Sequence, residues 1–256
     1  MKKVFLLAIA ALVSVNSFAQ YEAKMEQQNV IKGSVIVNGE KIDGYIKKKP
    51  TVEVNGEKVP AMYLLQEDIL FIEKNTFETI DKIKGKNIVK YSPKDCDGFY
   101  YGDYCFETRK FCIDPTAMGT NAIPKKIFLH VLKQYDKVTF YAFYDNTGNT
   151  SPDENGLAKL DPEKVAEHIK NPAIAYYLTG ADRAKNVCQL NAKKELADCP
   201  AILEKVANKM YKVDRSADDN YKLFGIATST NSEILAIGDD NRNLNILEDY
   251  INGICE

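Results

Sequence analysis

The hydrophobic pattern of the first half of the chain alternates with a period of two, and turn residues interrupt it at short intervals. The segments "VIVNGEKI" (Val35 to Ile42) and "VEVNGEKV" (Val52 to Val59) place Asn-Gly between β-branched residues. Asn-Gly is a strong hairpin signal, because a type I′ turn needs positive φ at both central positions. The pattern therefore predicts two successive hairpins, with Pro50 between them.

Further apolar runs extend this pattern into an antiparallel meander, because apolar and polar residues alternate along them. The predicted strands are Met62 to Leu65, Ile69 to Ile72 and Asn87 to Tyr91, followed by a hairpin of Ile127 to Gln134 and Val138 to Tyr144. The first half is therefore expected to be rich in β-structure.

The stretch "DCDGFYYGDYCF", residues 95–106, predicts another hairpin, with Gly102-Asp103 as its two-residue turn. This register pairs Tyr101 with Tyr104, Tyr100 with Cys105 and Phe99 with Phe106. Phe99, Tyr101, Tyr104 and Phe106 then share one face and form an aromatic cluster against the core. A competing register that turns at Tyr100-Tyr101 pairs Cys96 with Cys105, but it leaves the glycine outside the turn.

The pattern changes in the second half of the chain. The stretch "DNTGNTSPDENG", residues 145–156, has no apolar residue and predicts an exposed loop. Asp161 and Pro162 are typical of the start of a helix, which ends before Asn171-Pro172. Asp198 is expected to cap a second helix, and residues 244–254 show helical spacing.

These elements predict an α+β protein, with an antiparallel β-meander-rich first half followed by a mixed half with short helices. The expected organisation is a signal peptide over residues 1–19, a β-rich region over 20–145, an exposed loop over 146–160 and a mixed region over 161–256. The last region is expected to pack on the first as one unit.

The first residues, "MKKVFLLAIAALVSVNSFAQ", follow the order of a secretory signal. Lys2 and Lys3 are followed by the apolar run Val4 to Val15 and by Ser17-Phe18-Ala19, which places small residues at the cleavage site. The apolar run is shorter than the roughly 20 residues that span a bilayer. We therefore expect cleavage near Ala19, a periplasmic or secreted product, and no transmembrane segment after cleavage.

The charge balance indicates few electrostatic partners. The chain has a formal net charge of −2, and removal of the signal lysines makes it more negative. A chain of this charge has no general attraction for nucleic acid or anionic lipid. We therefore expect no nucleic-acid partner, and an envelope protein or glycan as the partner.

Six cysteines follow the signal, which in an exported protein suggests up to three disulfides. The candidates are Cys96, Cys105, Cys112, Cys188, Cys199 and Cys255. One specific expectation is a Cys188–Cys199 bridge, which would tie the second helix to the segment before it and requires Cys188 to lie in a strand or loop. Free thiols are the alternative interpretation.

Catalytic and metal motifs are absent from the sequence. The chain has two histidines, His130 in a predicted strand and His168 in a predicted helix, and neither has a partner in sequence register. Counted from Asp95, the stretch Asp95 to Asp103 does not match the EF-hand spacing. Asp153-Glu154-Asn155 and Asp239-Asp240-Asn241 are similar acidic turns, and a solvated turn is the favoured interpretation of each. We therefore assign no catalytic, cofactor-binding or metal-ligating residue and expect no cofactor.

Glycan binding or cleavage stays open at this point. Sugar platforms often use tryptophan, of which the chain has none, although Tyr63, Tyr100 and Tyr104 could substitute. A core or cross-strand position is the favoured interpretation of each of these tyrosines. Paired carboxylates for glycoside hydrolysis cannot be located from spacing, because they meet only in the fold.

Several segments together resemble a group of uncharacterised exported proteins of Bacteroidetes-type bacteria. The similar segments are "GSVIVNGEKIDGYIK", "VKYSPKDCDGFYYGDYCFE", "KIFLHVLKQYDKVTFYAFYD" and "LADCPAILEKV", and Cys96 stands where the group has an apolar residue. The resemblance implies export and a shared fold, and it carries no active site. The sequence thus favours a non-catalytic binding module of the periplasm or cell surface, with a hydrolase of an envelope glycan or peptide as the alternative.

Overall fold

Both Asn-Gly repeats form the predicted hairpins. Strand β1 (Val30–Val37) turns into β2 (Glu40–Lys47), and β3 (Thr51–Val54) turns into β4 (Glu57–Pro60). The turn residues Asn38, Gly39, Asn55 and Gly56 all have positive φ, as a type I′ turn requires.

The structure is a computed structural model, and it describes residues 20–112, 123–153, 157–211 and 242–255.

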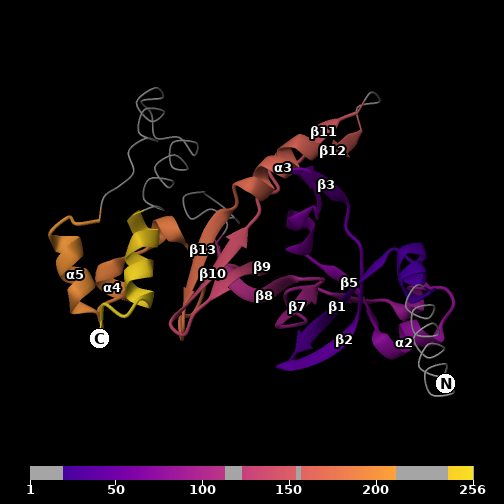
Figure 1. Cartoon of the computed structure of the whole chain (residues 1–256), viewed down its shortest axis with the longest axis horizontal. Coiled ribbons are helices and arrows are strands. Elements are labelled where there is room, and N and C mark those ends of the chain that lie inside the picture. The colour runs from indigo at the N-terminus through magenta and orange to yellow at the C-terminus, as the bar shows by residue number, and fades with distance from the viewer. Residues whose placement is uncertain (1–19, 113–122, 154–156, 212–241, 256) are drawn as a thin grey trace, which may run out of the picture.

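A ten-stranded antiparallel sheet runs through the length of the protein (Figure 1). Its strand order is β14-β13-β10-β9-β8-β7-β1-β2-β5-β6. Besides β1 and β2, the strands are β5 (Ile69–Glu73), β6 (Val89–Tyr91), β7 (Gly98–Tyr101), β8 (Tyr104–Phe111), β9 (Lys125–Gln134), β10 (Val138–Phe143), β13 (Ala173–Leu178) and β14 (Lys185–Asn186). With its short helices, this sheet confirms the α+β class.

The order departs from a simple meander at β7, which pairs with β1 rather than with β6. Gly33 explains part of this pairing, since a Cβ at this position would lie 2.4 Å from the carbonyl oxygen of Tyr100 on β7. Only glycine allows the two backbones to approach this closely. The non-local β1–β7 pair leaves no periodic signal in the sequence.

The hairpin of β7 and β8 has the predicted register, with Tyr101 opposite Tyr104 and Phe99 opposite Phe106. The rings of Phe99 and Phe106 stack with centroids 4.8 Å apart, and Phe128 meets Phe99 edge-on at 4.8 Å. All three are fully buried. The aromatic cluster of this hairpin is therefore part of the main core, the cluster of buried residues that also contains Val35, Ile46 and Phe71.

Residues Met62–Leu65 were expected to form a strand, and that prediction was wrong: they form the 3₁₀ helix η1. Residues three apart eclipse in a 3₁₀ helix, so Met62 and Leu65 point the same way. Both are buried in the main core with Phe71. In a strand, Met62 and Leu65 would have pointed to opposite faces, because they are three residues apart.

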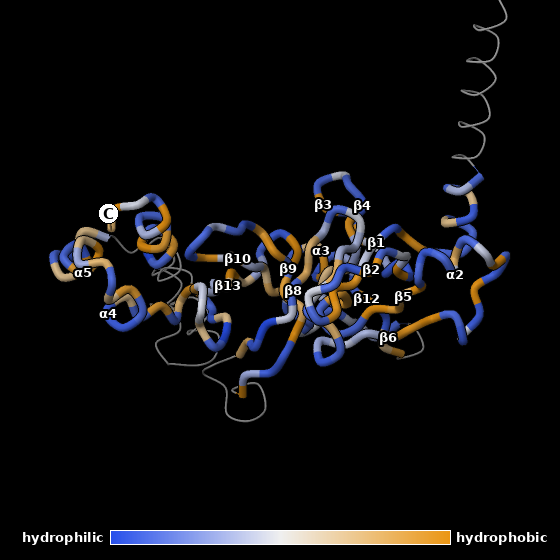
Figure 2. Tube along the Cα trace, turned by 90° about the horizontal axis from the view of Figure 1, so that it is seen from below, coloured by the Kyte–Doolittle hydropathy of each residue, from blue (hydrophilic) through white to orange (hydrophobic). Residues whose placement is uncertain are grey.

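A projection beside the sheet combines elements from both halves of the chain (Figure 1). Helix α3 (Pro162–Lys170) begins as predicted, with Asp161 accepting a hydrogen bond from the Lys164 backbone. It packs on the β3–β4 hairpin through Val52, Ala61, Val165 and Ala166. The hairpin tip is hydrophilic (Figure 2).

The stretch 146–160, expected to be an exposed loop, contains two short paired strands. These are β11 (Thr150–Pro152) and β12 (Ala158–Leu160). Asn149 is buried beside them and bonds to His168 of α3. The turn-rich composition thus predicted the surface position of the segment but not its strands.

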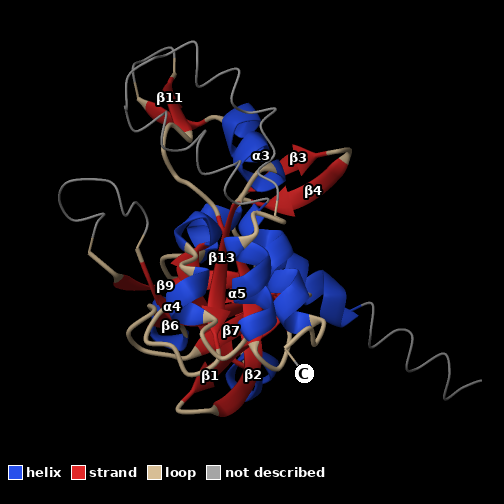
Figure 3. Cartoon of the chain, turned by 90° about the vertical axis from the view of Figure 1, so that its left-hand side faces the viewer, coloured by secondary structure: helices blue, strands red, loops and turns tan. Residues whose placement is uncertain are grey.

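Short helices pack at the β13 end of the sheet, as Figure 3 shows in a view from that end. They are η4 (Val187–Gln189), α4 (Ala192–Glu195), α5 (Pro200–Ala207) and the helical residues 242–251. Their apolar side chains, including Leu196, Ile202 and Leu247, bury Phe140 and Tyr176 of the sheet. Asp198 was predicted to cap α5, but Cys199 takes the N-cap position without a side-chain bond, while Asp198 accepts a hydrogen bond from Tyr250.

The opposite end of the sheet is covered by the helical residues 20–27 and by α2 (Lys74–Thr79). Here Met25, Val30, Tyr45, Ile72 and Phe77 form a separate small core. The 3₁₀ helix η2 (Gly85–Asn87) connects α2 to β6. No helix among the described residues has the length and apolar character needed to cross a bilayer.

Candidate functional site

The candidate site lies at the edge of β8. Strand β7 pairs with β8 only as far as Glu107. Beyond that point the Thr108 amide donates to the Asp97 carbonyl at 2.8 Å, and the Ala184 amide donates to the Lys110 carbonyl at 3.0 Å. The loop after β13 therefore reaches back to β8, across the positions of β10 and β9, and the sheet curls.

A groove lies along this edge, with a volume of about 340 Å³. We call it the edge groove. It is lined by Asp97, Thr108, Arg109, Lys110, Lys126, Tyr177, Ala181, Asp182 and Arg183. Three parts of the chain thus contribute to one hollow: the β7–β8 hairpin, the start of β9 and the end of β13 with its loop.

A polar network holds Arg109 in place at the groove. The Tyr141 hydroxyl donates to Oε2 of Glu107 at 2.6 Å and accepts from Nε of Arg109 at 2.9 Å. Nη2 of Arg109 donates to the same Glu107 oxygen at 2.7 Å. The guanidinium also lies over the ring of Tyr177, 4.5 Å from its centroid. Arg109 is therefore fixed by one charge, one hydroxyl and one aromatic face.

The electrostatics of this network keep Arg109 charged and Tyr141 neutral. Burial alone would lower the pKa of Arg109, but the hydrogen bond to Tyr141 and the charge of Glu107 outweigh it and leave that pKa raised. Burial, with the hydrogen bond to Glu107, raises the pKa of Tyr141 well above its ordinary value. The side chain of Arg109 is still 31% exposed, so it is reachable from the groove.

A second hollow adjoins the edge groove and shares Lys110, Ala181, Asp182 and Arg183 with it. Its volume is about 660 Å³, and it extends toward Lys185 and Lys194. Lys185 pairs with Glu195 at 2.9 Å, and Glu195 also accepts from Tyr176. The two hollows are thus neighbours that meet at these four shared residues.

The structure contains a larger cavity, of about 900 Å³, near Cys188, Asn191 and Asn243. Tyr211 and Arg242 also line it, and these residues flank a segment outside the described part of the chain. We assign no site to it.

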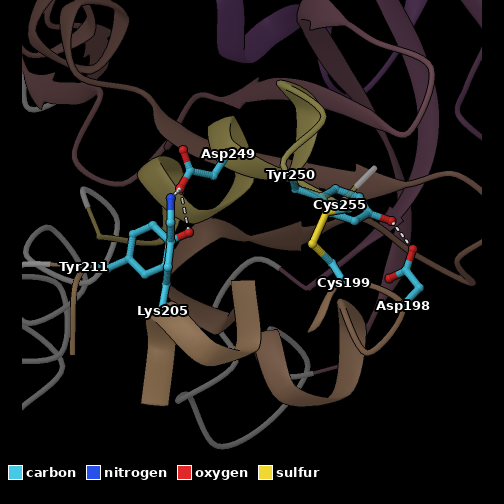
Figure 4. The surroundings of a disulfide bond; sticks show 7 residues. All are labelled: Asp198, Cys199, Lys205, Tyr211, Asp249, Tyr250 and Cys255. Carbon is cyan, nitrogen blue, oxygen red and sulfur yellow. Dashed lines mark hydrogen bonds and ion pairs between the residues drawn. A yellow bond between two sulfur atoms is a disulfide. The ribbon is translucent and has the colours of Figure 1, made fainter. Parts of the chain in front are cut away.

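Cys199 and Cys255 form a disulfide, which joins the start of α5 to the end of the described chain (Figure 4). The predicted Cys188–Cys199 bridge was therefore wrong, because the chain returns after residue 242 and brings Cys255, not Cys188, to Cys199. Around the disulfide, Asp249 accepts from Lys205 and Tyr211, at 2.8 and 2.7 Å (Figure 4). The same pair of segments is thus held by a covalent bond and by polar contacts.

The other candidate cysteines lie at separate places. Cys112 follows β8 directly and is buried, and Cys188 lies in η4. Burial raises the pKa of the Cys96 thiol to about 11, and burial also raises the pKa of Cys105. A thiol with a raised pKa holds little thiolate near neutrality, so Cys96 and Cys105 are poorly suited to nucleophilic chemistry.

The histidines also make no catalytic pair with a carboxylate or a thiol in the described structure. Nδ1 of His130 lies 2.7 Å from the Tyr144 hydroxyl, and its ring packs between Tyr104 and Phe106. Burial lowers the pKa of His130 to about 4. Nδ1 of His168 bonds to Asn149 at 2.8 Å.

The acidic turns have structural contacts where the structure describes them. Oδ2 of Asp95 accepts two bonds from Ser92, which lower its pKa, and Oδ2 of Asp97 accepts from the Gly39 amide. Residues 154–155 and 239–241 lie outside the described part. Among the described residues, no three His, Cys, Asp or Glu side chains come together as a metal site.

The three tyrosines considered as a sugar platform are dispersed. Tyr63 and Tyr104 are half-buried against the main core. Tyr100 is 37% exposed on the other face of its strand, with Nζ of Lys41 5.0 Å from the centroid of its ring. The platform is therefore not formed by these residues together.

The residues of the edge groove were missed in the sequence, above all Arg109 and Tyr177. A signal existed, since Glu107 and Arg109 carry opposite charges two residues apart in one predicted strand, and such residues share a face. Their partners Tyr141 and Tyr177 lie more than thirty residues away. No spacing rule connects them.

No family model, curated protein sequence or solved structure matches this chain. The assignment of a function therefore rests on the groove itself.

Proposed function

We propose that this protein is an exported binding module of the periplasm or cell surface, and that the edge groove is where it binds an envelope glycan. The observation that carries the proposal is the fixed Arg109 at an accessible groove, stacked on Tyr177 and hydrogen-bonded to Glu107 and Tyr141. Ligand sites are typically concave and have a few well-positioned polar groups.

Export is supported by the signal-like residues 1–19 and by the Cys199–Cys255 disulfide, since disulfides persist in oxidising compartments. The resemblance to exported proteins of Bacteroidetes-type bacteria points the same way. Mass spectrometry of the exported protein is expected to find an N-terminus at Gln20, and retention of Met1 in that material would contradict export.

Binding is tested with the purified protein and a panel of neutral and acidic polysaccharides, together with polysaccharide fractions from the native envelope. Retention of at least one glycan, and its loss in Arg109→Ala and Tyr177→Ala, is the expected result. Lys86→Ala on η2 is the matched control, because Lys86 is exposed and lines neither hollow. Equal loss in the control, or no retention of any glycan, would refute the proposal.

A hydrolase of an envelope glycan is the second candidate, because Asp97 and Asp182 line the same groove. Glycoside hydrolysis uses two carboxyl groups that flank the scissile bond. Chromatography of a retained oligosaccharide after prolonged incubation separates the two functions. Shortened products that disappear in Asp97→Asn or Asp182→Asn would establish the hydrolase, and an unchanged oligosaccharide supports the binding module.

A further inference from the structure

The sequence Val-Asn-Gly-Glu-Lys occurs twice, at residues 37–41 and 54–58, and each copy contains the turn of a hairpin. Asparagine followed by glycine is especially prone to deamidation, because glycine has no side chain to shield its backbone nitrogen. The local sequence is the same in the two copies. A difference in their reactivity must therefore come from the structure around each turn.

Deamidation begins with attack of the glycine backbone nitrogen on the side-chain carbonyl carbon of the asparagine. A bond forms between this nitrogen and Cγ, the bond between Cγ and Nδ2 breaks, and ammonia leaves with the proton of the glycine N–H. Water then opens the cyclic imide to aspartate or isoaspartate, without an oxidant or a reductant. In a type I′ turn the glycine nitrogen points away from the asparagine side chain, so the asparagine must first rotate about its Cα–C bond. The reaction therefore requires the turn to open.

The turn between β1 and β2 is held closed by Asp97. Oδ2 of Asp97 accepts a hydrogen bond from the Gly39 amide at 2.8 Å, and the Asp97 amide donates to the Ile36 carbonyl at 2.7 Å. Hydrogen bonds to a carboxylate are stronger than those between neutral groups. Strand β1 also lies between β2 and β7 in the ten-stranded sheet. The attacking N–H of this copy is thus occupied, and the chain is tied on both sides of Asn38.

The turn between β3 and β4 has no such support. Asn55 and Gly56 are exposed, and the Gly56 amide has no hydrogen-bond partner among the described residues. The two strands have four residues each and pair only with each other, in the projection beside the sheet (Figure 1). Contact with α3 involves Val52, at the other end of β3. Local opening is easiest in elements with so few contacts.

We infer that Asn55 is a deamidation site of this protein, and that the bonds of Asp97 protect Asn38 from the same reaction. The inference does not depend on the proposed binding function. Both products add a negative charge beside Glu57 at the exposed hairpin tip. The isoaspartate product also inserts an additional carbon into the backbone of the two-residue turn.

Incubation of the purified protein at neutral and mildly alkaline pH, followed by peptide mapping with mass spectrometry, tests the inference. Asn55 is expected to deamidate about tenfold faster than Asn38, because the charge-assisted bond of Gly39 must break before Asn38 can react. In urea the two copies should react at similar rates, since their local sequences are the same.

Two variants test the role of Asp97. Asp97→Ala is expected to accelerate the deamidation of Asn38 by about tenfold and to leave that of Asn55 unchanged. Asp95→Ala is the matched control, because this nearby carboxylate bonds to Ser92 and not to the turn. It should change neither rate. Circular dichroism of each variant confirms that it is folded.

The opposite outcomes are equally clear. Equal rates at the two sites of the folded protein, a faster reaction at Asn38, or reaction of Asn55 only in urea would each overturn the inference. An unchanged rate of Asn38 in folded Asp97→Ala would contradict its protection by Asp97. A slower rate would contradict it as well, and would identify the carboxylate as a base that activates Gly39. If Asp97→Ala does not fold, the rates of the folded and urea-unfolded wild-type protein decide.

Discussion

The guanidinium carbon of Arg109 lies over the ring of Tyr177, 4.5 Å from its centroid, and these two residues come from strands that are not neighbours in the sheet. The contact is possible because the loop after β13 returns to β8, where Ala184 bonds to Lys110. Curling of the sheet thus creates both the groove and the position of its arginine.

Removal of the Tyr141 hydroxyl should weaken the network. Tyr141 is fully buried, and Tyr141→Phe leaves Glu107 and Arg109 each without one hydrogen bond. We expect a loss of about 1–3 kcal/mol in the free energy of unfolding, measured by urea titration. Tyr177→Phe keeps the ring under Arg109 and should change that free energy by less than about 0.5 kcal/mol. Equal effects of the two variants would contradict the network.

The Cys199–Cys255 disulfide should contribute strongly to stability. The two cysteines are separated by 56 residues, and closing a loop of this length is worth about 4 kcal/mol in the chain-entropy model. Cys199→Ala/Cys255→Ala should lower the free energy of unfolding by that order, and reductant should destabilise the wild-type protein but not the double variant. Peptide mapping without reduction checks the pairing directly, and finding both thiols free in exported protein would refute it.

His130 should make the protein less stable in mild acid. Burial lowers its pKa from 6.5 to about 4, so between these values the unfolded chain binds a proton that the folded protein does not. The free energy of unfolding should therefore fall as the pH drops from 6.5 to 4, by about 3 kcal/mol from this residue. An NMR titration of the His130 ring should show a midpoint near 4, and a midpoint near 6.5 would contradict its burial.

Replacement of two buried polar side chains, Ser34 and Gln66, should have different effects on the free energy of unfolding. Oγ of Ser34 is buried without a hydrogen-bond partner among the described residues, so Ser34→Ala should be neutral or stabilising by up to about 1 kcal/mol. Gln66 is buried as well, but it bonds to both the amide and the carbonyl of Tyr144. Gln66→Leu should therefore cost about 2–3 kcal/mol. Thermal or urea unfolding distinguishes the two, and a similar loss in both would refute the assignment.

The local elements of this fold were predictable, and their non-local arrangement was not. Asn38-Gly39, Gly102-Asp103 and Asp161-Pro162 each carry a complete signal within a few residues, and the two hairpins and α3 follow them. The pairing of β7 with β1 depends on Gly33, which meets a strand more than sixty residues away in the sequence. The short run Met62–Leu65 failed because four apolar residues fit a strand and a 3₁₀ helix equally well.

The site was less predictable than the fold for the same reason. Glu107 and Arg109 could be seen as charges on one strand, but Tyr141, Tyr177 and Arg183 become their neighbours only through the curl of the sheet. The cysteines show the same limit, because Cys199 pairs with the distant Cys255 and not with the nearby Cys188. Spacing in the sequence contains no information on either contact.

The position of the bound ligand is the central claim, and mapping it by NMR tests it most directly. Amide chemical shifts of the ¹⁵N-labelled protein would be followed while an oligosaccharide of the glycan that is retained in the polysaccharide panel is added. We expect the largest changes at residues 107–110, 126 and 181–185, with the Arg109 side-chain Nε signal among them. Changes confined to the helices around Asn191 and Asn243, or to the Tyr21 and Tyr45 end of the sheet, would place the ligand elsewhere and contradict the edge groove as the binding site.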